Sequence, residues 1–171
     1  NRSQRGSSLL EIPVSLWMVF VVFFIPMFSL ASITLQTTLL NISLQDAVQA
    51  ASKTRTFSLD SDEGPSARNA AQQVFQAHKQ LFPALSTANI DLDIIQTQIN
   101  GGAATRSVTP LSSPANTDAF VYQIEGFVTA SIQPLVTFNN SIFGDVPGLT
   151  APINVSFRAR QMFENAQGLN R

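Results

Sequence analysis

Few residues of this chain have the types and spacing that catalysis or metal binding requires. Histidine occurs once, as His78, and cysteine is absent, which excludes thiol catalysis, disulfides and thiolate metal sites together. Asp91 and Asp93 stand two positions apart on one expected strand, hence on one face, but no third acid follows nearby to complete a cation site. The sequence contains no nucleophile–base set, phosphate-binding loop or metal cluster. We therefore predict no catalytic residues, no metal site and no cofactor, and a protein that is not an enzyme.

The remaining titratable candidates have structural interpretations. His78 falls on or beside the apolar side of a predicted helix, where a lone histidine is usually a packed residue rather than a ligand. Arg158 and Arg160 share the polar face of the last predicted strand. Because cross-strand pairs of opposite charge stabilise a sheet, we expect these arginines to pair with an acid such as Glu125.

Composition narrows the class of partner. The chain has 171 residues, enough for one globular domain and an appendage. Its formal net charge of -1 gives no electrostatic basis for binding nucleic acid. Only 12% of the residues are charged, well below the usual quarter. Such a sparsely charged exterior is typical of a chain that packs against lipid or other protein.

An uncharged segment dominates the N-terminal part of the chain. Residues 12–45 carry no formal charge, and residues 12–35 are mostly large and apolar, which is enough for the roughly 20 residues that a membrane-spanning helix needs. Arg2 and Arg5 precede this run and favour a cytoplasmic N-terminus. A cleavable signal peptide is the alternative, because Ser29-Leu30-Ala31 resembles a cleavage site. Since the chain carries both sides of that site, we predict a retained transmembrane anchor over residues 12–35.

Two further features shape this predicted helix. Pro26 lies inside it and must remove a backbone hydrogen bond, so we expect a kink there; the alternative is a melted stretch used in subunit packing. Beyond the apolar run, Leu, Ile, Ala and Val keep a helical spacing among Gln and Ser as far as about Thr54. We expect residues 36–57 to form an amphipathic stalk, whose apolar stripe needs a cover outside the bilayer.

The rest of the chain, residues 58–171, has the pattern of a small extracytoplasmic domain. An acidic loop leads into an amphipathic helix expected over residues 67–82, with Leu81 and Phe82 among its apolar positions. Alternation of period two then predicts three half-buried antiparallel strands, over residues 89–99, 119–132 and 153–163.

The predicted fold class is therefore α+β. It comprises a long N-terminal transmembrane and stalk helix, a second amphipathic helix, and a small antiparallel sheet of about three strands. The segment over residues 133–152 is too apolar for a free loop and is expected to fold back onto the domain or the stalk.

The residues around the start of the apolar run form a motif. Arg5 and Gly6 are followed by Ser7-Ser8-Leu9-Leu10, then by Glu11, then by the hydrophobic helix. This resembles the processing signal of type IV pilin-like proteins, in which a membrane peptidase cuts after the glycine. Within that superfamily the chain is most similar to the TadE/TadF group of tight-adherence pilus proteins. The stalk LQDAVQAASKTRTF and the tail over residues 128–164, a strand, an apolar loop with proline and a final strand, share their layout.

The resemblance implies a pilin-like fold and a non-enzymatic role, as a pseudopilin or minor pilin in the assembly of a Tad-type pilus or related secretion apparatus. It implies a prepilin peptidase that cuts between Gly6 and Ser7, and a contact of Glu11 with the new amino terminus of a neighbouring subunit. Membrane lipid and other pilin-like subunits are the implied partners. From the residues alone, Glu11 has a second interpretation, an acid at headgroup level near the positive end of the helix dipole.

Two departures from the family pattern keep an alternative function open. Ile12 stands where the family commonly has an aromatic residue, and the residues ahead of Gly6 are still part of the chain. The alternative is an accessory structural subunit, docked by the same helix into a larger membrane complex. A third hypothesis, a ligand-binding domain, is disfavoured by the lack of convergent polar groups. The expected location is the bacterial inner membrane in a single pass, with residues 1–11 cytoplasmic and the C-terminal domain periplasmic or otherwise extracytoplasmic.

Overall fold

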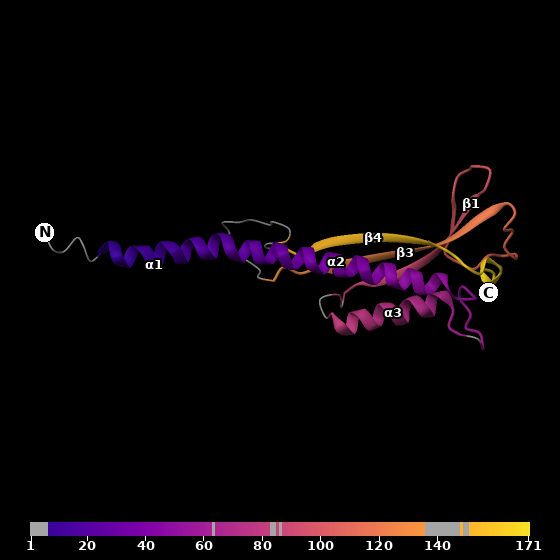
Figure 1. Ribbon diagram of the computed structural model, residues 1–171, viewed down its shortest axis with the longest axis horizontal. Helices are drawn as coiled ribbons and strands as arrows, with labels where there is room; N and C mark the ends of the chain where they lie inside the picture. Colours follow the sequence, from indigo (N-terminus) through magenta and orange to yellow (C-terminus); the bar gives the residue numbers. More distant parts are fainter. Residues whose placement is uncertain (1–6, 63, 83–84, 86, 136–147, 149–150) are drawn as a thin grey trace. The chain divides into compact units, whose positions relative to one another are not determined.

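The protein is an α+β structure, as predicted (Figure 1). The computed structural model describes residues 7–62, 64–82, 85, 87–135, 148 and 151–171, with side chains from residue 13 onward. Its helical elements are α1 (Ser7–Val19), the π-helical turn η1 (Phe20–Phe24), α2 (Ile25–Ser52), α3 (Ala67–Leu81) and the 3₁₀ turn η3 (Ala166–Gly168). Its strands are β1 (Asn89–Gln98), β2 (Thr105–Ser107), β3 (Phe120–Ile132) and β4 (Ile153–Met162).

The chain divides into two compact units. The first, called the helix unit below, comprises Asn1–Gln36 and Ile132–Ile153; the second, the sheet unit, comprises Thr37–Ser131 and Asn154–Arg171. The helix unit contains α1, η1 and the first turns of α2. The last turns of α2 belong to the sheet unit, together with α3, β1, β2 and most of β3 and β4. The helical spacing expected as far as about Thr54 agrees with the observed end of α2 at Ser52.

The sheet has four strands in the order β2-β1-β3-β4, so the prediction of about three strands was one short. Strand β1 is antiparallel to both β2 and β3, with Leu92 opposite Gly126 and Asp93 opposite Glu125. The missed strand, β2, contains only three residues and lies in a segment rich in Gly, Ser, Thr and Pro. Three residues are too few to display a period of two, and their pairing with β1 became apparent only in the structure.

The core of the sheet unit lies between one face of the sheet and the helices α2 and α3. Alternate residues of β1 and β3, including Leu92, Ile94 and Ile124, are buried on this face as the alternation predicted. From α2 the core receives a stripe of buried side chains, namely Leu40, Leu44, Ala47, Val48 and Ala51. Gly126 of β3 lies directly beneath α2, because a Cβ added to it would clash with Val48 and lie 3.0 Å from the Leu44 side chain. The missing side chain therefore lets the helix approach the strand closely.

Helix α3 begins at a cap formed by its own sequence. Ser66 is the N-cap residue, and its side chain accepts a hydrogen bond from the amide of Asn69. Asp60 reinforces this end, because its carboxylate accepts from the Ser66 amide at 2.7 Å and from the Asn69 side chain at 2.8 Å. These bonds, with the Ser66 amide foremost, lower the pKa of Asp60 below its ordinary value.

The other end of α3 differs in one respect from the predicted apolar face. Leu81, the last helical residue, is 72% exposed, so its predicted place on the packed side was wrong. The next residue, Phe82, leaves the helical conformation, with φ near -126° and ψ near 85°. This change of direction lets Phe82 pack against the core in place of Leu81.

Candidate functional site: the apolar helix and the outer face of the sheet

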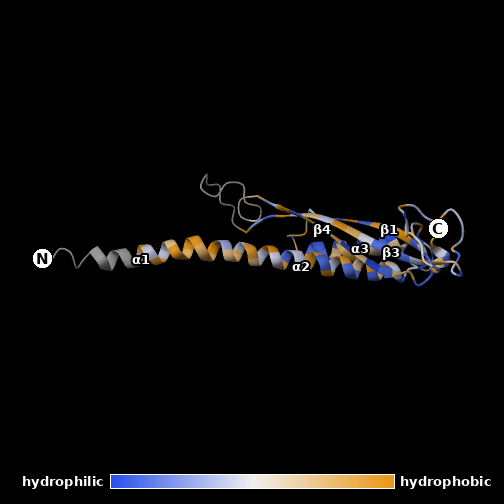
Figure 2. Ribbon diagram, turned by 90° about the horizontal axis from the view of Figure 1, so that it is seen from above, coloured by the Kyte–Doolittle hydropathy of each residue, from blue (hydrophilic) through white to orange (hydrophobic). Residues whose placement is uncertain are grey.

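Hydrophobic residues dominate the helix around η1 (Figure 2), and many of their large side chains are exposed. Side chains at least 46% exposed there are Val14, Leu16, Trp17, Met18, Val19, Phe20, Val22, Phe23, Phe24, Met27, Phe28, Leu30 and Leu35. In the part of the chain that the structure describes, one helical stretch, the 40 residues Pro13–Ser52, is long and apolar enough to cross a membrane. At about 1.5 Å per residue it measures about 60 Å, roughly twice the hydrocarbon core of a bilayer. A bilayer would therefore enclose only about half of this length, and the rest includes the apolar stripe of α2 that is buried in the sheet unit.

The helix contains a π-helical turn, Phe20–Phe24, which ends directly before Ile25 and Pro26. In a regular α-helix the ring of Pro26 would collide with the carbonyl of Val22 and leave that carbonyl without a donor. A π-helical turn bonds a carbonyl to the amide five residues ahead, and the observed turn, Phe20–Phe24, lies directly before this site. We attribute the turn to Pro26. The kink predicted at this residue stays a prediction, whereas the change of helix type is observed.

One side of α2 is covered within the helix unit. Ser29 is fully buried and Ile33 is 7% exposed, whereas the residues next to them along the helix are exposed or half-buried. Gly148 contacts this side, because a Cβ added to it would lie 3.1 Å from the Ile33 side chain and 2.8 Å from that of Ile153. Most of the segment predicted to fold back, residues 136–147, lies outside the described residues.

The residues predicted for processing and subunit contact are near the start of α1. Gly6 lies outside the described residues. Ser7 begins α1 and Glu11 belongs to its second turn, but their side chains also lie outside the described groups. Their proposed roles in cleavage and contact therefore remain predictions.

The most concentrated group of charges lies on the outer face of the sheet, opposite the helices. Glu125 of β3 is fully buried there, because three arginines cover it. Arg106 of β2 and Arg160 of β4 form close ion pairs with its two carboxylate oxygens, and Arg158 Nη1 lies 3.5 Å from Oε1. The predicted pairing of Arg158 and Arg160 with Glu125 is thus confirmed, and Arg106 is a partner that sequence reasoning missed.

The strand register places a second acid beside Glu125. Asp93 stands directly opposite Glu125, and two adjacent carboxylates repel each other unless cations compensate them. Arg106 bridges the two acids, with its Nε 3.4 Å from Asp93 Oδ2. The central pair of strands therefore carries the acids and the flanking strands carry the bases. The two sets of charges hold the four strands together across the solvent-facing side.

His78 also forms a defined polar contact, between α3 and α2. Its Nδ1 lies 2.9 Å from the Oγ of Ser43, and its Nε2 lies 3.5 Å from Asp46 Oδ2. These residue types are those of a hydrolytic triad, but the Ser43 hydroxyl donates to the carbonyl of Leu39 at 2.8 Å and is fully buried. Ser43 can then only accept from His78, which is the reverse of activation by a base. The contact is a clamp between two helices, consistent with the interpretation of His78 as a packed residue.

A metal-binding cluster and similarity to known proteins are two further features that could indicate a function. Within the described ranges, no three His, Asp or Glu side chains are grouped so that they could hold a metal ion. No family model matches the chain, and no curated protein or solved structure is significantly similar to it.

Proposed function

We propose that the chain is a membrane-anchored, non-enzymatic assembly subunit, a pseudopilin or minor pilin of the TadE/TadF-like kind. The observation that carries this proposal is the change of environment along a single helix. Large apolar side chains are exposed around η1, whereas the last turns of α2 bury their apolar stripe beneath a sheet. A helix that enters lipid at one end and serves as the spine of a folded domain at the other supports an anchored structural subunit.

In this proposal α1, η1 and the start of α2 lie in the bacterial inner membrane, with the N-terminus in the cytoplasm. Arg2 and Arg5 precede the apolar run, and the sheet unit follows it on the periplasmic or otherwise extracytoplasmic side. Protease added to spheroplasts should digest the sheet unit and leave the apolar helix. Complete protection of the sheet unit would reverse the orientation.

Glu11 is the proposed point of contact with a neighbouring subunit. A carboxylate at the edge of an apolar helix costs free energy unless a positive group compensates it, and the amino terminus released by cleavage after Gly6 is such a group. Glu11→Gln keeps the shape of the side chain and removes its charge. The variant should insert and fold normally but should lose most of its association with other subunits.

The decisive experiment is co-purification of tagged and untagged copies, and of their natural partners, from membranes that carry each variant. Asp118→Asn, which removes one exposed acid in a turn of the sheet unit, is the matched control and should associate normally. Association of Glu11→Gln at the wild-type level would remove the assembly role of this acid. The mass of the N-terminus in native membranes separates the two assembly hypotheses. A chain that starts at Ser7 supports the pilin-like subunit, and an intact bond between Gly6 and Ser7 supports an accessory subunit docked in a larger complex.

A further inference from the structure

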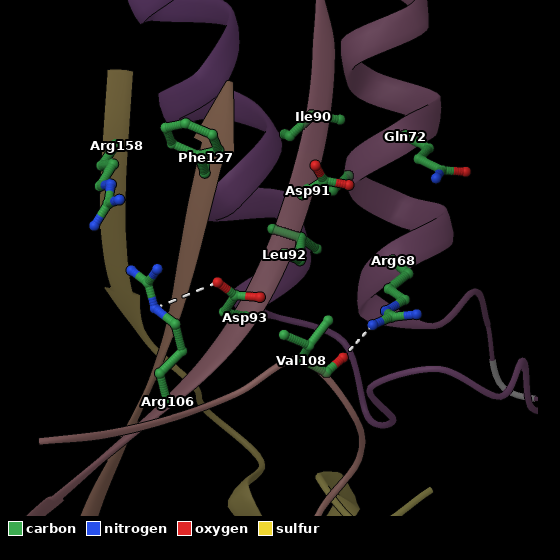
Figure 3. A pocket seen from close by; sticks show the side chains of 11 residues that line it. Arg68, Gln72, Ile90, Asp91, Leu92, Asp93, Arg106, Val108, Phe127 and Arg158 are labelled. Atoms are coloured by element: carbon green, nitrogen blue, oxygen red, sulfur yellow. Dashed lines mark hydrogen bonds and ion pairs between the residues drawn. The ribbon is translucent and has the colours of Figure 1, made fainter. Parts of the chain in front are cut away.

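A groove runs along the first half of β1, from α3 on one side of this strand to Phe127 of β3 and Arg158 of β4 on the other (Figure 3). Its volume is about 500 Å³, within the range of roughly 300–1,000 Å³ typical of ligand sites. Arg68 and Gln72 of α3 form one wall, and the opposite wall contains Asp91, Asp93 and Arg106. All of these residues belong to the sheet unit.

The floor of the groove is an unpaired strand edge. Strand β2 pairs only with Ile94–Gln96, so the preceding residues of β1 have a neighbour, β3, on one side only. The Ile99 amide, just after β1, donates to the carbonyl of Ala119 on the β3 side. In an antiparallel ladder, alternate residues direct their N–H and C=O groups to opposite sides of the strand. The N–H and C=O groups of Ile90 and Leu92 therefore point away from β3. Leu92 lines the groove although its side chain is buried in the core at 6% exposure, so the groove meets its main chain. Across the described parts of the chain, no hydrogen bond reaches these main-chain groups from the groove side.

The segment that follows β2 is held away from this edge of β1. If β2 continued in register, Val108 would stand opposite Asp93. Instead the strand stops at Ser107, whose hydroxyl donates to the carbonyl of Thr109 at 2.7 Å. Arg68 of α3 donates to the Val108 carbonyl and stacks on the ring of Phe57 at 5.0 Å. These contacts draw the segment after β2 toward α3 and leave the edge of β1 open.

The charges around the groove indicate what kind of strand would fit. Arg106 and Arg158 are already paired with Glu125, and Asp93 is paired with Arg106. Asp91 is exposed, and its carboxylate has no hydrogen-bond or ion-pair partner in the part of the chain that the structure describes. The cation on the α3 wall, Arg68, is bound to the Val108 carbonyl. On the outer side of the edge, the Asp91 carboxylate is therefore the group that a basic side chain of a neighbouring strand could pair with.

We propose that this groove accepts an extended segment of a partner protein, which adds a strand to the edge of β1 and places a basic side chain beside Asp91. Main-chain hydrogen bonds to Ile90 and Leu92 would supply affinity, and the charge pair would supply selectivity. The other edge of the sheet, β4, carries the exposed bases Arg158 and Arg160, which discourage strand addition. This surface belongs to the sheet unit alone and does not depend on the role proposed for the apolar helix.

The test uses the full chain in detergent micelles and three synthetic peptides. The first alternates threonine and valine around one central lysine, the second has glutamate in place of the lysine, and the third is the lysine peptide with alternate backbone amides methylated. Binding is followed by the amide chemical shifts of Ile90 and Leu92. We expect the lysine peptide to shift both amides, the glutamate peptide to bind about two- to fivefold more weakly, and the methylated peptide not to bind.

Two variants link this binding to the proposed geometry. Asp91→Asn should weaken the binding of the lysine peptide by about two- to fivefold, whereas the control Asp118→Asn should leave this binding unchanged. Arg68→Ala should release the segment at Val108 to cover the edge, and should reduce the binding of every peptide. The proposal is overturned if no peptide shifts the two amides, or if the methylated peptide binds as well as its parent. Shifts that depend on protein concentration without peptide would assign the edge to a second copy and overturn the partner named here.

Discussion

Replacement of Glu125 by glutamine tests how the outer face of the sheet is held together. The change keeps the size of the side chain and removes the negative charge that three arginines share. Glu125 is fully buried, whereas the side chains of Arg106, Arg158 and Arg160 are 38%, 55% and 53% exposed. Because the arginines remain solvated, each pair is comparable to a surface pair of about 0.2–1 kcal/mol rather than to a fully buried one of about 3–5 kcal/mol. We therefore expect Glu125→Gln to lower the free energy of unfolding by about 1–3 kcal/mol.

The assay is denaturant unfolding of the full chain in detergent micelles, followed by the near-ultraviolet circular dichroism of Tyr122. This is the only tyrosine, it is 5% exposed in the core, and its hydroxyl accepts from the Asn116 amide at 3.0 Å. Asp118→Asn removes the same charge from an exposed turn and should change stability by no more than about 0.5 kcal/mol. Added salt should narrow the difference between Glu125→Gln and the wild type, because it screens the repulsion among the arginines that remain. Equal stability of Glu125→Gln and Asp118→Asn would refute a stabilising role of these ion pairs. A loss of stability in Glu125→Gln that salt does not change would assign the effect to packing instead.

Three further outcomes follow from the fold. The lowered pKa of Asp60 stabilises the folded state above its ordinary value of 3.8, and this contribution disappears as the pH falls through the lowered value. Asp60→Asn should therefore be less stable than wild type near neutral pH and should converge with it in strong acid, as measured by urea unfolding across that range. Gly126→Ala should cost about 1–3 kcal/mol by overpacking in the same unfolding assay, whereas Gly102→Ala, which meets only the flexible end of a side chain, should cost much less. Pro26→Ala should return Phe20–Phe24 to α-helical geometry, and backbone chemical shifts that still report the π-helical turn would contradict its attribution to the proline.

Periodicity predicted the elements whose side chains alternate over many residues. It located the long helix, α3 and three strands. Because alternate residues of a strand share one face, it also predicted that Arg158 and Arg160 could pair with an acid such as Glu125. Arg106 could not be assigned in the same way, because its strand has only three residues and its partner depends on the register with β1.

Contacts between elements distant in the sequence were beyond this kind of analysis. The bond between Ser43 and His78 requires α2 and α3 to lie side by side, and neither sequence contains a signal for that arrangement. The open edge of β1 likewise depends on where β2 stops. Pro26 did predict a disturbance of the helix, expected as a kink or a melted stretch, but the π-helical turn directly before it was not predicted.

The π-helical turn has a consequence for the direction from which a neighbour can approach. An α-helix has 3.6 residues per turn, so one additional residue within a turn rotates the preceding part by about 100° relative to the following part. In the helix unit, α1 therefore presents a different side from the one that an uninterrupted helix would align with Ser29 and Ile33. In the proposed assembly, a partner helix that packed on α1 would therefore approach it from a direction set by the π-helical turn. The π-helical turn before Pro26 thus sets the angle between the covered side of α2, at Ser29 and Ile33, and the side of α1 that would be available for packing.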